Sequence, residues 1–248
     1  MKRTGICEGV AACMLATIAT PALADSDDLL PAPVPDVPTM ARSASGFVPP
    51  GWEIERTARG DLNGDKRPDL ALVIRSTDKN LIIANPNGLG TDSFNSNPRA
   101  IIVALNLGVR GYGLSDVSTK LIPRIDNAII DDPFGESEMV IKKGVLLVSI
   151  RFWASAGSWS MSNTTFTFRD QNEAVQLIGY DQTHIHRASG EMTTTSVNYM
   201  TGRMSIGKGS IEHDRVKKTW KNIGKTPLLR LSEMENGWDF DPARGTGN

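Results

Sequence analysis

The chain has few cysteines and histidines, and no excess of charge of either sign. The two cysteines, Cys7 and Cys13, both lie near the N-terminus. If that segment is removed on export, the remaining chain has no thiol, which excludes a disulfide framework and cysteine chemistry. Basic and acidic residues number 27 and 28, which gives a net charge of −1. This balance gives no reason to expect binding to nucleic acid or to an anionic membrane surface.

Long apolar runs are absent as well. The apolar stretch at residues 10–20 is too short to cross a bilayer, so we expect no membrane span. It follows a positively charged start and precedes the small-x-small sequence at 22–24, which together predict a secretory signal peptide over residues 1–24. Residues 10–13 have the residue types of a lipoprotein cleavage box, but they lie too early in the segment. We therefore expect a periplasmic or secreted protein after cleavage near Ala24.

Proline and small polar residues set the predicted boundaries of the folded domain. Residues 25–50 carry four closely spaced prolines before a small-residue stretch, so this segment is expected to be a disordered Pro-rich arm. The glycines and charges near the C-terminus predict a flexible tail over residues 233–248. Between the two, residues 51–232 are long enough for a single β-rich domain with one sizeable core.

No stretch of the expected mature segment shows apolar residues at helical spacing, while several short segments alternate or are rich in strand formers. Glycines at 144 and 202 predict hairpin turns. These patterns predict an all-β or β-dominated fold with antiparallel meanders and hairpins, and leave residues 109–132 as a loop with short regular pieces. The predicted strands cover residues 52–57, 70–74, 81–84, 100–105, 138–141, 145–153, 163–169, 174–181, 193–199, 203–206 and 215–222.

The strongest chemical signal is the segment that reads G-D-L-N-G-D-K-R-P-D-L-A-L-V-I. Asp61, Asn63, Asp65 and Asp69 occupy the first, third, fifth and ninth places of a polar loop. Alternate residues of a tight loop can turn their oxygens toward one hard cation, and the backbone carbonyl of Arg67 can fill a gap. These residues are the predicted ligands of a calcium ion. An Asx-rich turn without any metal is the alternative explanation.

Two positions depart from a helix-loop-helix calcium hand. Lys66 stands where glycine is usual, so we expect it to adopt the left-handed conformation, and Leu72 stands where a bidentate glutamate is usual. The loop instead leads into a strand. In this it resembles the single calcium-loop unit of the FG-GAP and VCBS repeats, D-x-N-G-D-G-x-x-D-L. That resemblance implies that the four side chains are ligands. Because those repeats build propellers from tandem copies and no second copy is found here, a propeller is not expected.

A wider resemblance covers most of residues 47–229. The segments F-V-P-P-G-W, I-K-K-G-V-L-L-V-S, T-F-T-F-R, L-I-G-Y-D and S-V-N-Y-M-T-G-R, in this order around the loop, are similar to a group of exported bacterial proteins of unknown function. The resemblance implies a location and a shape but no activity.

Two other groups of polar residues have the residue types of a zinc site or of a nucleophile. His184 and His186, with Asp181 nearby in sequence, could hold zinc, but we interpret them as ordinary surface histidines. Ser155, Ser158 and Ser160 lie in a glycine-containing segment without a nucleophile-elbow pattern.

Two acidic pairs could supply the carboxylates of a glycoside hydrolase: Asp131 with Asp132, and Glu136 with Glu138. Their position beside proline and glycine favours a solvated loop instead. No catalytic residue is therefore predicted.

We expect an exported, non-enzymatic envelope protein with a structural calcium loop, which could have an unidentified envelope protein as its partner. The alternative is a periplasmic partner-binding inhibitor or immunity-type protein, and a hydrolase of envelope polymer is the least supported. Trp159, beside Gly157 and Ser158, is the tryptophan to examine for exposure, because tryptophan is frequent in binding hot spots.

Overall fold

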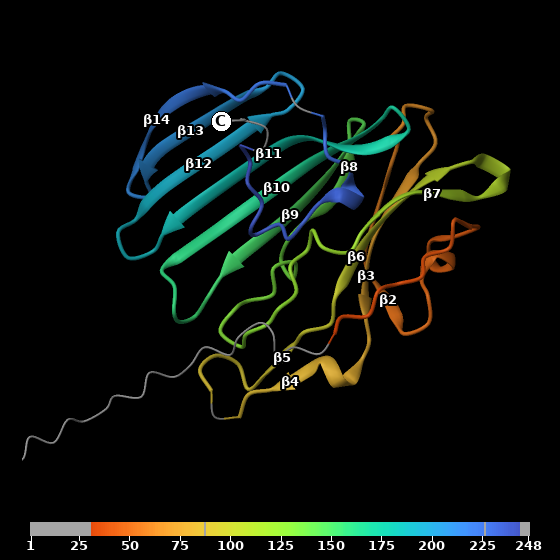
Figure 1. Ribbon diagram of the computed structural model, residues 1–248, viewed down its shortest axis with the longest axis horizontal. Helices are drawn as coiled ribbons and strands as arrows, with labels where there is room; N and C mark the ends of the chain where they lie inside the picture. Colours follow the sequence, from red (N-terminus) through yellow and green to blue (C-terminus); the bar gives the residue numbers. More distant parts are fainter. Residues whose placement is uncertain (1–30, 87, 226, 244–248) are drawn as a thin grey trace, which may run out of the picture.

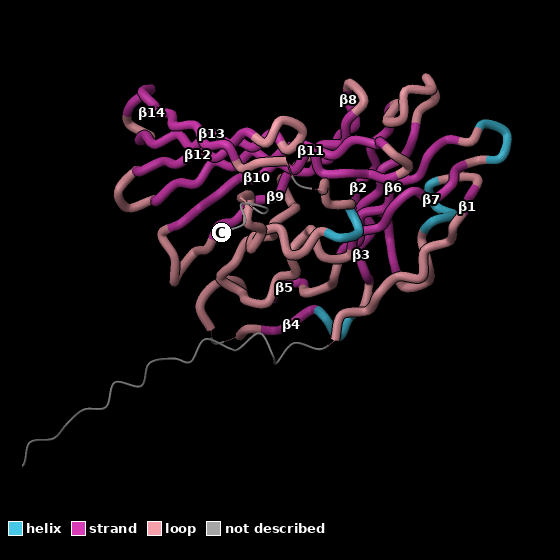
Figure 2. Tube along the Cα trace, turned by 45° about the horizontal axis from the view of Figure 1, so that its top comes forward, coloured by secondary structure: helices cyan, strands magenta, loops and turns pink. Residues whose placement is uncertain are grey.

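Antiparallel strands build the part of the chain that the computed structural model describes, residues 31–86, 88–225 and 227–243 (Figures 1 and 2). Among these residues the β-dominated fold predicted from the sequence is confirmed, and the strands form open sheets rather than propeller blades. The predicted signal peptide, residues 1–24, lies outside the described residues.

The first sheet has five strands in the order β1-β7-β6-β3-β2. Its central strands read L-A-L-V-I and A-I-I-V-A, continuous apolar runs that are typical of strands buried on both faces. The bounds are β1 Met40–Ala41, β2 Trp52–Gly60, β3 Asp69–Ser76, β6 Arg99–Asn106 and β7 Tyr112–Ser118.

The second sheet is a meander of seven strands that pair in chain order from β8 to β14. The predicted turns are confirmed, because Gly144 and Gly202 have φ values of 74° and 66°. The bounds are β8 Met139–Lys142, β9 Val145–Trp153, β10 Ser160–Gln171, β11 Ala174–His186, β12 Glu191–Asn198, β13 Arg203–Ser210 and β14 His213–Asn222.

Two short strands, β4 Ile82–Ala84 and β5 Ser93–Asn95, form a separate hairpin. Four short 3₁₀ helices complete the described structure: η2 Ala44–Phe47, η3 Lys79–Leu81, η4 Gly108–Arg110 and η5 Leu231–Glu233.

The main core lies between the two large sheets. Val73 and Val103 of the first sheet belong to the same buried cluster as Val148 and Phe166 of the second. Because successive strand residues point to opposite faces, the alternate residues of β3 and β6 form a second buried cluster on the other side of the first sheet. Both faces of the first sheet are therefore covered.

The N-terminal arm supplies the cover of this second cluster, so the expectation of a disordered arm is wrong for its C-terminal part. Met40 and Ala41 pair with Gly113 and Tyr112 of β7, and Phe47 is fully buried. The apolar residues on that face of β3 and β6 would otherwise meet water, which explains why the arm packs. Residues 25–30 of the predicted arm lie outside the described residues.

The expectation of a flexible tail is wrong in the same way for residues 233–243. Figure 1 shows the C-terminal segment running across the second sheet. Met234 and Phe240 are buried, and the indole of Trp238 donates a 3.1 Å hydrogen bond to the carbonyl of Arg151. Phe240 also packs edge-on against Phe166 at 5.4 Å. This segment therefore belongs to the core, and residues 244–248 lie outside the described residues.

Replacing Phe47 by alanine tests the packing of the arm. Because the ring is fully buried against β3 and β6, Phe47→Ala is expected to lower the free energy of unfolding by about 3–5 kcal/mol. Denaturant unfolding followed by circular dichroism measures this change. The control is Val109→Ala, since Val109 is 99% exposed and its loss is expected to cost less than about 0.5 kcal/mol. Equal stability of the two variants would contradict the described packing of the arm.

Candidate functional site

The loop between β2 and β3 is closed by its own side chains. The two carboxylate oxygens of Asp61 accept hydrogen bonds from the backbone amides of Gly64 and Lys66, at 2.7 and 2.8 Å. Asn63 Oδ1 accepts from the amide of Asp65 at 3.0 Å, and Asp65 Oδ1 accepts from the amide of Arg67 at 2.8 Å. These are Asx turns, in which a short polar side chain bonds the backbone that follows it.

Lys66 adopts the left-handed conformation predicted for it, with φ at 67°. A side chain in this region costs about 1–2 kcal/mol relative to the right-handed conformation. The hydrogen bond from its amide to Asp61 helps to offset that cost.

Asp69 anchors the loop to the first sheet. It is fully buried, and its two oxygens accept 2.8 Å hydrogen bonds from the amides of Leu62 and Asn106. Asn106 in turn donates from its side-chain amide to the carbonyl of Pro68 at 3.1 Å. A buried carboxylate needs such donors to balance its desolvation. The loop is therefore joined to the end of β6 through one side chain.

The side chain of Arg67 is half-exposed and pairs with a carboxylate of the loop. Its Nε lies 3.0 Å from Asp65 Oδ2, and the Arg67 backbone amide is the main cause that lowers the pKa of Asp65. Over the described residues, no three acidic, histidine or cysteine side chains lie close enough together to hold a metal ion. Calcium binding would thus require the oxygens of Asp61 and Asp65 to come closer to the other ligands, and it stays a prediction.

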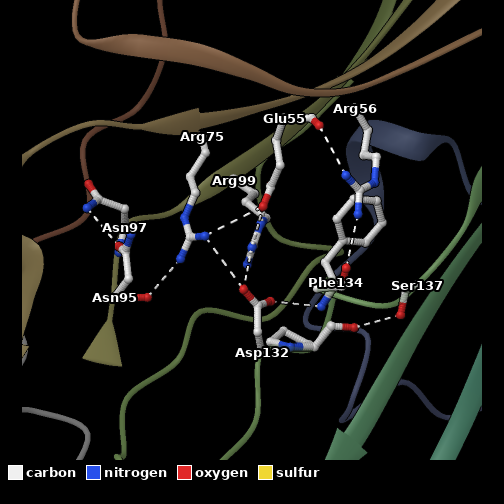
Figure 3. A network of polar contacts seen from close by, with 11 residues as sticks. Glu55, Arg56, Arg75, Asn95, Asn97, Arg99, Asp132, Phe134 and Ser137 are labelled. Carbon is white, nitrogen blue, oxygen red and sulfur yellow. Dashed lines mark hydrogen bonds and ion pairs between the residues drawn. The ribbon is translucent and has the colours of Figure 1, made fainter. Parts of the chain in front are cut away.

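A second polar cluster, which the sequence reasoning missed, lies between the first sheet and the loop before β8 (Figure 3). The guanidinium of Arg99, with its side chain 2% exposed, donates to both oxygens of Glu55 and, at 2.7 Å, to Asp132 Oδ2. Arg75 Nη1 lies 3.5 Å from Glu55 and 3.6 Å from Asp132, and its Nη2 donates to the carbonyl of Asn95. Two arginines and two carboxylates thus neutralise one another.

The sequence does carry a signal for this cluster. Arg75 and Arg99 each stand at the end of an otherwise apolar strand, and charged residues in buried strands are almost always paired. What one sequence does not give is the partner, because Asp132 comes from a loop 33 residues further along the chain.

Three of the four carboxylates that could serve hydrolysis face arginines in the cluster or beside it. Burial of Asp132 opposes its ionisation, but the hydrogen bond and charge of Arg99 outweigh burial and lower its pKa. Asp131 and Glu136 both face Arg151, at 3.9 and 2.8 Å. A general acid needs a raised pKa, so Asp132 is poorly suited to that role.

The histidines do not assemble the zinc site that was considered. His184 and His186 lie on the same face of β11, whereas Asp181 lies on the opposite face because strand side chains alternate. His186 Nδ1 is 2.9 Å from the hydroxyl of Ser189.

The serine-containing loop before β10 is held by Arg187. Its Nη2 donates to the carbonyls of Ala154 and Ser158, both at 2.6 Å. The guanidinium lies 4.9 Å from the ring of Trp153 and 5.9 Å from that of Trp159, which is 62% exposed. The hydroxyl of Ser155 donates to the carbonyl of Ile129, and that of Ser158 accepts from the amide of Ser160.

Comparisons with known proteins give no information about the site. No family model, curated protein or solved structure matches the chain. The resemblance of the loop to the FG-GAP and VCBS unit, and of the longer segment to exported bacterial proteins, therefore stays a hypothesis. In the part of the chain that the structure describes, no helix combines the length and the apolar composition that crossing a membrane requires.

The pH dependence of stability tests the ion-pair cluster. The pKa of Asp132 in the folded protein lies below its ordinary value of 3.8, so its contribution is present above about pH 4 and is lost as the pH falls through the lower value. Asp132→Asn is expected to cost about 3 kcal/mol at neutral pH, since Arg99 keeps a buried charge with one partner fewer. The cost should shrink below pH 3.8.

The neighbouring Asp131→Asn is the matched control. Its side chain is 51% exposed, and its carboxylate lies 3.9 Å from Arg151, a long distance for an ion pair. The substitution is therefore expected to cost less than about 1 kcal/mol at any pH. Urea unfolding at a series of pH values measures both variants. If the cost of Asp132→Asn stays constant between pH 7 and pH 2.5, the assigned ionisation of Asp132 is wrong.

Proposed function

We propose that the protein is an exported, non-enzymatic envelope protein whose loop at residues 61–69 is a structural calcium site. The supporting observation is the position of Asp69. This buried residue links the loop to β6, so any ligand held by the loop would act directly on the central sheet. A cation at this place would stabilise a strand connection, and no reaction is required of it.

The ligands proposed for calcium are Asp61, Asn63, Asp65 and Asp69 with the carbonyl of Arg67. Asn63 and Asp65 are exposed and Asp61 is half-buried, so an ion from solvent can reach them. Their oxygens are hard ligands of the kind calcium prefers, and each can accept more than the hydrogen bond it now has. When bound, the ion would neutralise the carboxylates and hold the two ends of the loop together.

The non-enzymatic part of the proposal is supported by the pairing of the acidic residues. Asp132 and Glu136 have arginines as partners, and Asp69 is bonded to backbone amides. Carboxylates neutralised in this way are poorly suited to act as a raised-pKa acid or a free base. Export is supported by the sequence at residues 1–24, which follows the pattern of a signal peptide.

One observation favours the second candidate, a partner-binding inhibitor of immunity type. Trp159 projects from the loop held by Arg187 and is 62% exposed, beside a hollow of about 350 Å³ lined by Ser155, Gly157 and Arg187. An exposed tryptophan next to a hollow resembles the anchor of a protein interface. This candidate differs from the first in requiring a protein partner.

Thermal unfolding in chelator and then in calcium tests the proposed site. A ligand that binds only the folded state stabilises it, by about 2.7 kcal/mol at a concentration one hundred times its Kd. We expect calcium to raise the unfolding midpoint more than magnesium or zinc does. The double variant Asp61→Asn with Asp65→Asn removes both charges, so it should lose the calcium response. Asparagine at position 61 keeps one of the two acceptor oxygens, so the variant should also lose some stability in chelator while remaining folded.

Two further variants act as controls. Asp69→Ala leaves the amides of Leu62 and Asn106 without a partner, and should be destabilised by about 1–3 kcal/mol or more even in chelator. His184→Ala should leave the calcium response unchanged. A full calcium response in the double variant would show that the proposed ligands are wrong, and no response in the wild type would leave an Asx-rich turn.

A further inference from the structure

The second sheet has one face that the core does not use. Phe166, Tyr180 and Val197 point into the core, so the residues next to them on each strand point outward. The register places these outward residues in a row across five strands. The row is Thr165, Asp181, Ser196, Ser205 and Trp220, from β10 to β14.

A second row runs parallel to the first. It consists of Asn163, Thr183, Thr194, Gly207 and Lys218. A groove with a volume of about 540 Å³ lies over these two rows. Every strand from β10 to β14 contributes to its lining. These strands lie side by side in chain order (Figure 1), so the groove runs across them.

Gly207 shapes the middle of this groove. A Cβ at this position would overlap with Thr194 Oγ1 and with Val216 Cγ1. The neighbouring side chains of β12 and β14 therefore converge over a strand that has no side chain there. The groove is thus formed by the packing of the sheet itself.

The lining favours a ligand rich in hydroxyl groups. Its side chains are mainly threonine and serine hydroxyls, with the amide of Asn163, the carboxylate of Asp181 and the ammonium of Lys218. Such groups donate and accept hydrogen bonds in many directions. A protein partner with an apolar anchor would find little to pack against here, because only Val216 and Trp220 present large apolar surface.

Trp220 provides a flat surface at one end of the groove. Its side chain is 63% exposed, and the guanidinium of Arg203 lies 4.7 Å from its ring. An exposed indole combines an apolar face with a polar N–H. The C–H face of a pyranose ring can stack on such a surface while its hydroxyl groups bond the neighbouring serine and threonine side chains.

Positive charge at one end of the groove favours hydroxyl-rich ligands that carry negative charge. Besides Lys218, the strands β13 and β14 carry five further cations. Arg203 lies on the face of the groove, Lys208, Lys217 and Lys221 lie on the opposite face of the same edge, and Arg215 lies beside an irregularity in the strand pairing. Within the described residues none of these six cations forms an ion pair, although the whole chain has a net charge of −1. The last two strands thus form a basic edge that attracts negative charge.

Lysines on an edge strand also discourage pairing with strands of other molecules. That role accounts for charge on β14, but it requires neither a groove lined with hydroxyl groups nor an exposed tryptophan within it.

We propose that this groove binds an anionic polysaccharide. One sugar ring stacks on Trp220, an acidic group of the chain pairs with Lys218, and sugar hydroxyls bond the side chains of Thr194, Ser196 and Asp181. A second hollow of about 340 Å³ shares Asn163 with the groove, but it is lined by Glu136 and Glu138 as well as Arg151, so an acidic chain is not expected to continue into it. This proposal goes beyond the proposed envelope role and does not depend on calcium.

Titration calorimetry with polygalacturonate, a carboxylated polysaccharide, tests the proposal. The measurement is made in chelator at low salt, so that failure of the calcium site has no influence on the result. We expect binding that weakens as salt is added, and little binding of neutral dextran. Trp220→Ala and, separately, Lys218→Gln should each weaken binding about tenfold or more.

Matched controls lie away from the groove. Trp159→Ala removes the other strongly exposed tryptophan of the described chain, and Lys142→Gln removes an exposed lysine from the opposite edge of the sheet. Both should bind polygalacturonate like the wild type. Circular dichroism and thermal unfolding check that each variant is folded, and Lys218→Gln keeps the test valid if Trp220→Ala is not.

Several results would overturn the proposal. They are no binding of polygalacturonate, equal binding of neutral dextran, and a loss of affinity in the control variants as large as in the groove variants. Equal affinity for a single-stranded oligonucleotide would also overturn it, because the surface would then bind any polyanion rather than a polysaccharide.

Discussion

The fold depends on the need to cover both faces of the first sheet. Five successive residues of β3, from Leu70 to Ile74, are fully buried, so their side chains require apolar neighbours on both sides. The second sheet covers one face, and the arm with Phe47 covers the other. Because the described residues contain no α-helix, cover comes from a second sheet and from the arm with its short 3₁₀ helix η2. The arm and the C-terminal segment are therefore structural parts of the molecule.

The polar residues of this sheet follow from the same constraint. A charged side chain at the edge of a sheet that is buried on both faces is stable only if opposite charges or hydrogen-bonding groups lie next to it. Arg75 and Arg99 pair with Glu55 of β2 and with Asp132, which fixes the long loop that precedes β8. Asp69 is satisfied by backbone amides and fixes the loop after β2. Because they are buried, Arg75, Arg99 and Asp69 each hold a neighbouring loop against the first sheet.

The alternation and residue types of short segments were enough to predict the strands. The packing of the arm, the tail and the buried charges depends on residues far away in the sequence. Each predicted strand has a counterpart in the structure, although 174–181 extends to His186 and 163–169 starts at Ser160, because pairing with a neighbouring strand continues past the apolar residues. The arm and tail were misjudged because Phe47 and Phe240 are isolated apolar residues among prolines, glycines and charges. Their burial depends on surfaces that are formed by other parts of the chain. The positive φ of Lys66 was predictable because its cause is local, whereas the partners of Asp69 and Arg99 were not.

The two faces of the second sheet have different tasks: the inner face packs in the core, and the outer face carries the proposed binding groove. Its inner face carries Phe166, Tyr180 and the other core residues, while its outer face carries hydroxyl groups and charges at the alternate positions of the same strands. Alternation makes the two faces independent, since a change on the outer face leaves the core side chains untouched. The basic edge then follows from the meander: β14 is the last strand, it has a neighbour on one side only, and its long cationic side chains can remain in water. A ligand drawn to that edge meets the row of hydroxyl groups that leads from it across the sheet.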